Sequence, residues 1–230
     1  ADGRPMRHIL EPYLNYTFNP EPNVLPDELY QFDNIDTLTE ENRIRLGVRN
    51  KLQAKREDGP FSLIDLDTFA DLNFNHEGDK GLREKVYVKA ETHPGGRVQI
   101  DFDARIDPDN GLEAFNSQMW LSQERTWSSK LEYRFIKDES TLYIADLTLH
   151  PVQNWSYNVF GRYEGQDSRL QEIGGYIQRG LDCLKVRLGT GYMPGYTRSD
   201  GLEMDPEWHV IFGLWLTAMP GQDDMSRHMK

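Results

Sequence analysis

The chain has 230 residues, of which 37% are hydrophobic and 28% are charged, and its formal net charge is -12. This balance argues against a nucleic-acid partner, because 38 acidic side chains set against 26 basic ones repel phosphates. No stretch approaches the roughly 18 consecutive apolar residues of a membrane-spanning helix, and one cysteine, Cys183, cannot form an internal disulfide. This composition does not exclude a membrane β-barrel, because only alternate residues of its strands face lipid.

Apolar and polar residues alternate along most of the chain. A weak alternation at residues 8–18 precedes a polar stretch, residues 19–41, which we expect to be a long loop. We expect the shorter stretch 195–205 to be a loop as well. Further alternating segments follow at 43–52, 61–74, 85–91, 98–107, 112–121, 127–137, 141–149, 154–164, 170–179, 184–192 and 207–219. In one of them, Val98, Ile100 and Phe102 alternate with Asp101 and Asp103. A period of two predicts strands, because a helix would mix both sets on every face.

Short breaks rich in Gly, Pro, Asn and Asp separate these segments, at 57–60, 93–96, 107–111, 137–140 and 164–167. Strands joined so closely are antiparallel neighbours. We therefore predict an all-β fold: an antiparallel up-and-down meander of about twelve long amphipathic strands, forming an outer-membrane β-barrel or part of one. The prediction is a single domain over 1–230 with a polar tail at 221–230.

A soluble β-rich protein is the alternative, since many short strands also build sandwiches. Strand length favours the membrane barrel, because soluble strands average about five or six residues and these patterns often persist for ten. Aromatic residues near the strand ends are typical of interfacial girdles. These are Trp127, Trp155, Tyr163, Tyr192, Tyr196 and Trp208.

Charged rows on the polar parity are the candidate lumen-facing residues. They are Arg43, Arg45, Arg49 and Lys51, with Asp65, Asp67, Asp101, Asp103 and Arg105. A cationic stripe in a lumen could bind phosphates and carboxylates through charge-assisted hydrogen bonds. The structural alternative, slightly favoured, is that the stripe pairs with Asp65, Asp67 and Asp71 on the next strand.

Motifs for catalysis are lacking. The histidines, at 8, 76, 93, 150, 209 and 228, show no metal-ligand spacing, and no G-x-S-x-G elbow or phosphate loop occurs. The segment Asp107 to Gly111 with Glu113 suggests a turn far more than a calcium loop, because the full ligand spacing is missing. We expect a protein that is not an enzyme and has no metal or cofactor.

An ordered set of short motifs resembles the LptD family of lipopolysaccharide-assembly outer-membrane proteins, also called organic solvent tolerance proteins. The motifs are NIDTL at 34–38, ENRIRLGVRNKLQAKR at 41–56, LIDLD at 63–67, RLQE at 169–172 followed by Gln178 and Arg179, and LWLTAMP at 214–220. Their order matches the C-terminal half of that family's barrel. The resemblance implies that the chain is a fragment of a larger barrel that follows a periplasmic jelly-roll domain.

The same resemblance implies a function and partners. A translocon of this family inserts lipopolysaccharide into the outer leaflet through a lateral seam, with a plug lipoprotein inside the barrel and periplasmic bridge proteins below it. The implied seam strand contributes Val210, Phe212, Leu214 and Leu216. The expected partners are therefore lipopolysaccharide, membrane lipid and those proteins, in the outer membrane of a Gram-negative-type bacterium. A self-contained porin-like channel is the second hypothesis, and a soluble β-rich binding protein is the third.

Overall fold

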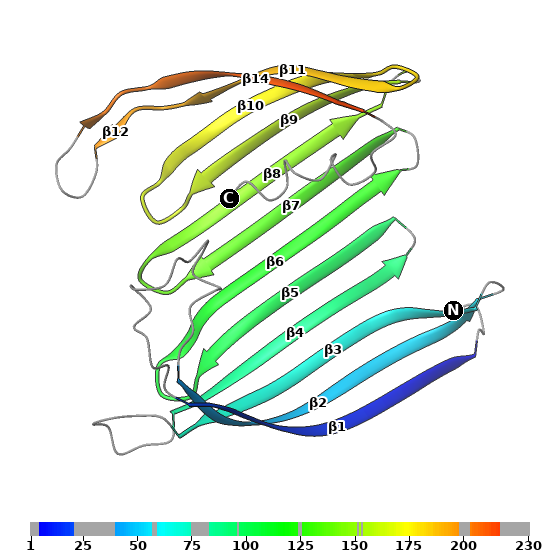
Figure 1. The fold of residues 1–230 in the computed structure, drawn as a ribbon, viewed down its shortest axis with the longest axis vertical. Coiled ribbons are helices and arrows are strands. Elements are labelled where there is room, and N and C mark those ends of the chain that lie inside the picture. Colours follow the sequence, from blue (N-terminus) through cyan, green and yellow to red (C-terminus); the bar gives the residue numbers. More distant parts are fainter. Residues whose placement is uncertain are drawn as a thin grey trace. The chain divides into compact units, whose positions relative to one another are not determined.

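The computed structural model describes residues 5–20, 40–56, 59–74, 83–95, 97–123, 126–150, 152, 154–197 and 203–216. These residues form strands, turns and short connections (Figure 1). Within the described ranges there is no helix long and apolar enough to cross a membrane. The predicted all-β fold class is confirmed.

Twelve strands form one antiparallel sheet in which the strands follow one another in chain order. Their bounds are β1 Met6–Asn19, β2 Glu41–Arg56, β3 Gly59–Asn73, β4 Arg83–Gly95, β5 Val98–Asp107, β6 Gly111–Gln123, β7 Trp127–Ile136, β8 Ser140–Leu149, β9 Trp155–Glu164, β10 Arg169–Gly180, β11 Leu184–Met193 and β14 Glu207–Leu216. Each matches one predicted segment, and the meander is confirmed. The sheet is consistent with part of a barrel and is not closed among the described residues, where β1 and β14 are its edge strands.

The chain divides into two compact units. The first contains Ala1–Pro94 and Asp101–Phe115, and the second contains Gly95–Ile100 and Asn116–Lys230. In the first unit, β2 pairs along its length with β1 on one side and β3 on the other, and β3 pairs in turn with β4. In the second unit, consecutive strands pair from β7 to β11, and β11 then pairs with β14.

Two β-bulges change which residues share a face. The β2–β3 register shifts between Leu52 and Gln53, and the β9–β10 register shifts between Leu170 and Glu172. An extra residue in one strand moves all later side chains to the opposite face. The bulge therefore places Leu170 and Ile173 on the same side of β10 although their sequence parity differs.

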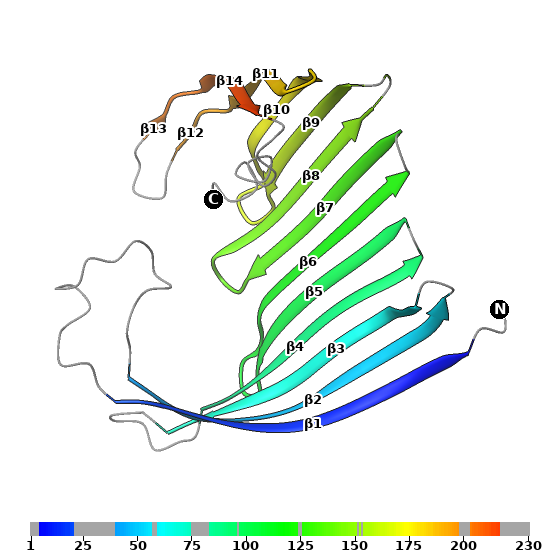
Figure 2. The ribbon, with the colours of Figure 1, turned by 45° about the vertical axis from the view of Figure 1, so that its right-hand side comes forward.

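The structure confirms one predicted connection and differs from the prediction at another. Asp107 to Gly111 contains a turn, as predicted: the Asp107 carboxylate accepts backbone N–H bonds from Asp109 and Asn110, 2.8 and 3.0 Å long. The stretch after β11, predicted as a loop, contains a short hairpin, β12 Tyr196–Thr197 with β13 Glu203–Met204. Figure 2 shows this hairpin continuing past the ends of β11 and β14. The interior of the predicted loop 19–41, the motif at 34–38, residues 217–220 and the tail 221–230 lie outside the described residues.

Candidate functional site

One face of the second unit is covered with exposed apolar side chains. The strand register brings apolar residues of neighbouring strands together on this face: Leu147 on β8 lies opposite Val159 on β9, and Leu188 on β11 lies opposite Phe212 on β14. Val210 and Phe212 are 76% and 70% exposed. We call the following set the second-unit apolar face: Leu131, Tyr143, Leu147, Leu149, Tyr157, Val159, Tyr163, Leu170, Ile173, Ile177, Leu188, Trp208, Val210, Phe212, Leu214 and Leu216.

The structure shows which residues of β14 belong to this face. Ile211, Gly213 and Trp215 alternate there with Phe212, Leu214 and Leu216, and both sets are apolar. The even-numbered set is exposed, and the odd-numbered set is partly covered on the opposite face. The predicted seam residues therefore all lie together on the second-unit apolar face.

Aromatic side chains mark both ends of this face. Near one end, Tyr133, Tyr143 and Tyr163 lie in register across three strands, with ring centroids 5.2 and 6.4 Å apart. At the same ends of β11 and β14, Tyr192 packs against Trp208 at 4.7 Å.

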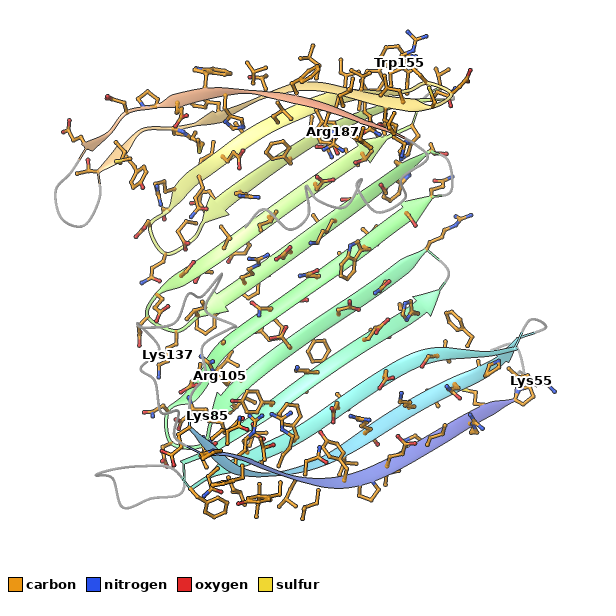
Figure 3. The ribbon with its side chains drawn as sticks, in the orientation of Figure 1. Lys55, Lys85, Arg105, Lys137, Trp155 and Arg187 are labelled. Carbon is orange, nitrogen blue, oxygen red and sulfur yellow. The ribbon has the colours of Figure 1, made fainter. Side chains whose placement is uncertain are left out.

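At the other ends of the strands, Trp155 stacks with Tyr157 at 6.4 Å, and the Arg179 guanidinium lies 5.1 Å from the centre of the Trp155 ring. Figure 3 shows Trp155 at the beginning of β9. Tyr196 is a different case, because it lies on β12 and is covered by the Arg169 guanidinium at 3.8 Å.

A hollow of about 560 Å³ opens beside the tyrosine row. Its lining is almost wholly apolar, from Met119, Leu131, Tyr143, Ala145 and Leu170 among others. The small residues Ala145 and Gly161 oppose each other at its floor, so the surface is lower there than around it. Such a depression can accommodate an extended apolar chain.

The first unit also has an exposed apolar face. Large apolar side chains are exposed along β1, and Met6 and Leu14 are the most exposed of them. Leu14 lies opposite Leu46, and Leu46 opposite Ala70, so the apolar character continues across β2 and β3. The exposed members form the first-unit apolar face: Met6, Leu10, Leu14, Tyr16, Phe18, Leu46 and Ile64.

The opposite face of the first unit carries paired charges. Arg45 donates two hydrogen bonds to Asp71, at 2.6 and 2.8 Å, and Arg43 reaches the same carboxylate at 3.4 Å. Only 4% of the Asp71 side chain is exposed. The next pairs along the strands are Lys51 with Asp65 at 2.9 Å and Arg49 with Asp67 at 3.7 Å. The predicted cationic stripe is therefore neutralised by the acidic row of β3, as the structural alternative expected.

Tyr13 joins three strands of this face. Its ring lies across Gly47 on β2, where a Cβ atom would collide with the ring. The hydroxyl then donates a hydrogen bond of 2.9 Å to Asp67 on β3, and the Arg49 guanidinium lies 5.1 Å from the ring centre. Glycine is required at position 47 because the ring occupies the space of a side chain.

A second charged group lies near the beginning of β4, the end of β5 and the beginning of β6. Lys85 and Arg105 both approach Glu113, at 2.9 and 2.8 Å, and Figure 3 shows the two cations close together. Arg105 is a predicted lumen residue, and its partner Glu113 was not predicted. Asp101 and Asp103, also predicted, lie on the same strand as Arg105.

The polar face of the second unit buries carboxylates and amides. Glu132 lies between Lys130, at 2.9 Å, and Arg134, with which it also forms an ion pair. Asn158, which is only 3% exposed, donates hydrogen bonds of 2.9 Å to Asp146 and Thr148. These residues were not singled out from the sequence, because nothing in the alternation distinguishes a buried polar residue from a solvated one.

The described residues contain no group of three or more His, Cys, Asp or Glu side chains that could hold a metal ion.

No protein-family model matches the chain, and no curated protein sequence matches it. The arrangement offers two kinds of surface: one for an apolar medium, and one for water and charged groups.

Proposed function

We propose that this chain forms part of the wall of an outer-membrane β-barrel, with its apolar faces against lipid and its polar faces toward an aqueous lumen. One observation carries the proposal: exposure is reversed relative to a soluble protein. Val210 and Phe212 are more than two-thirds exposed, whereas Asp71 and Glu132 are almost fully buried. Extended apolar patches of this kind on a protein surface mark contact with a membrane or a partner, and alternation of lipid-facing and lumen-facing residues is the pattern of a transmembrane barrel.

The size of the apolar face fits a bilayer. From Trp155 to Tyr163 the strand advances eight residues, which is about 26 Å at a rise of about 3.3 Å per residue. A tilt of about 40° reduces this to about 20 Å along the membrane normal, near the apolar band of about 25 Å in such barrels. The aromatic rows at both ends then lie where amphipathic rings are favoured.

The connections suggest an orientation. The three longest connections, residues 20–40, 74–82 and 194–206, follow β1, β3 and β11, whereas every other connection in the sheet has two to five residues, on either side. Outer-membrane barrels have short periplasmic turns and longer extracellular loops. We therefore place the ends of β1, β3 and β11 on the extracellular side.

Lipopolysaccharide is the cargo we propose, in an LptD-like translocon with a plug lipoprotein. The support is the resemblance carried by residues 41–56, 63–67, 169–172 and 214–220. Part of that resemblance lies on β14, an edge strand among the described residues, which bears the exposed Val210, Phe212, Leu214 and Leu216. An edge strand has unpaired backbone groups on one side, as a lateral opening requires.

Fluorescence quenching tests the membrane proposal. Single-tryptophan variants that keep only Trp208 or only Trp120 are folded into phosphatidylcholine vesicles with brominated acyl chains. Trp208 belongs to the second-unit apolar face, whereas Trp120 lies beside Lys130 of the polar face, 5.6 Å from its ammonium nitrogen. We expect strong quenching of Trp208 and little quenching of Trp120. Equal quenching of both, or of neither, would contradict the proposal.

Photo-crosslinking in a bacterium tests the cargo. A photoreactive phenylalanine analogue replaces Ile144 on the polar face or, as the control, Val159 on the apolar face. We expect lipopolysaccharide adducts at position 144 and phospholipid adducts at position 159. A membrane-inserted chain with no lipopolysaccharide adduct at either position would contradict the cargo and leave the barrel assignment intact.

A further inference from the structure

Arg187 on β11 makes different contacts from the ion-paired cations of the polar faces. The other paired cations each lie within ion-pair distance of a carboxylate: Arg43, Arg45, Arg49, Lys51, Lys85, Arg105, Lys130, Arg134 and Arg162. Arg187 contacts an amide and two aromatic rings. Among the described residues no carboxylate pairs with it. Its positive charge therefore lies on the second-unit polar face with no carboxylate partner among the described strands.

The guanidinium is held in a fixed orientation. Its Nε and Nη2 atoms both donate to the Gln178 side-chain oxygen, at 3.2 and 3.0 Å. The guanidinium carbon lies 4.0 Å from the centre of the Tyr176 ring and 4.9 Å from that of Trp215. Figure 3 shows Arg187 among the side chains of β10, β11 and β14. Contact with two rings favours the cation and removes water from it.

Glycine on the next strand makes room for this arrangement. Gly213 lies opposite Arg187 in the β11–β14 register, and the Trp215 ring lies where a side chain at position 213 would project. The ring is thereby brought toward Arg187 rather than away from it. A guanidinium has five N–H donors, and Gln178 accepts from two of its nitrogen atoms. The remaining donor edge is available to a ligand.

We propose that Arg187 is the centre of a binding site for a phosphate monoester. A planar fork of donors matches the oxygens of a phosphate and binds them in pairs. The fixed orientation lowers the entropy that a flexible arginine would lose on binding. The phosphate can belong to a lipid head group or to a soluble sugar, and both have this chemistry. The site rests on the geometry of β10, β11 and β14 and does not require the membrane proposal.

Binding of defined phosphates tests the site. The full chain is folded in zwitterionic detergent micelles, and affinity is measured by calorimetry for glucosamine 1-phosphate, inorganic phosphate and uncharged glucosamine. We expect binding of both phosphates and none of glucosamine. Arg187→Gln is expected to weaken phosphate binding at least about tenfold, the effect of losing hydrogen bonds to a charged group. The control is Arg179→Gln, because Arg179 is also stacked on a tryptophan but belongs to the apolar side of β10.

A second variant separates the loss of the phosphate site from misfolding of the chain. Arg187→Lys keeps the charge and loses the fork, so we expect an affinity between those of the unaltered chain and Arg187→Gln. Micelles containing a phosphorylated lipid then separate the two sources: competition with glucosamine 1-phosphate indicates a shared site that takes head groups, and its absence assigns the site to soluble phosphates. Three results would overturn the proposal: no phosphate binding, unchanged binding in Arg187→Gln, or an equal loss in Arg179→Gln. Tryptophan quenching reports membrane contact separately, so either proposal can fail alone.

Discussion

Arg45 on β2 and Asp71 on β3 face each other in register, joined by two hydrogen bonds of 2.6 and 2.8 Å. Only 4% of the Asp71 side chain is exposed, against 28% for Arg45. Arg43 approaches the same carboxylate at 3.4 Å. One buried carboxylate thus contacts two partly exposed cations, of which Arg43 also pairs with Glu41 at 2.9 Å.

Replacement of Asp71 by Asn is expected to destabilise the fold by about 2 to 3 kcal/mol. Removing the buried carboxylate leaves Arg45 uncompensated, whereas Arg43 keeps its ion pair with Glu41, and the partial exposure of both arginines reduces the cost. The free energy of unfolding in guanidinium chloride, for chain folded in micelles, measures the effect. Asp65→Asn is the matched control, because Asp65 also faces a β2 cation but is 36% exposed, and we expect a loss below about 1 kcal/mol. Equal losses in the two variants would show that burial of the carboxylate does not determine how much its ion pair stabilises the fold.

Replacement of Gly47 by Ala is expected to cost about 1 to 3 kcal/mol, the usual range for overpacking. The new methyl group would collide with the Tyr13 ring and break its hydrogen bond to Asp67. The same unfolding measurement on Tyr13→Ala and on the double variant completes a cycle. We expect Gly47→Ala to cost much less when Tyr13 is absent, and strictly additive losses would rule out the contact.

Replacement of Glu164 by Ala is expected to cost about 1 to 3 kcal/mol. Its carboxylate accepts hydrogen bonds of 2.6 Å from the Ser140 hydroxyl and from the Thr141 N–H, and one of 3.2 Å from the Gln166 N–H. Glu139→Ala, in the neighbouring turn, is the control, because that side chain is exposed. A loss in the control as large as in Glu164→Ala would mean that turn charge, not these bonds, stabilises the strand ends.

Much of the fold could be predicted from the sequence. The period of two identified all twelve strands, because in a two-faced sheet each strand must separate apolar from polar residues. The pairing of Arg45 with Asp71 was also predictable, since adjacent strands of opposite charge meet across a short turn. The face of β14 was not, because Ile211 and Trp215 are as apolar as Phe212 and Leu214. Only the register with β11 decides it.

Features that depend on contacts between three strands were missed. Tyr13 reaches Asp67 over Gly47, and Arg187 lies between Tyr176 and Trp215, so each depends on a register that no single segment reveals. The bulge near Leu170 had the same effect, because one extra residue reverses the parity that the alternation suggests. Buried polar residues such as Asn158 look like solvated ones until their neighbours are known.

The unfolding free energy of Val159→Arg in lipid vesicles tests the membrane proposal most directly. Val159 is 58% exposed in the middle of β9, opposite Leu147 and Gly175. An arginine there would lie in the centre of the bilayer, and we expect a loss of about 2 to 4 kcal/mol. Ile144→Arg is the control: position 144 lies on the polar face opposite Glu132 and Arg162, where we expect a loss below about 1 kcal/mol. A Val159→Arg chain that folds into vesicles with unchanged stability, or a loss in Ile144→Arg of the same size, would contradict the assignment of the two faces.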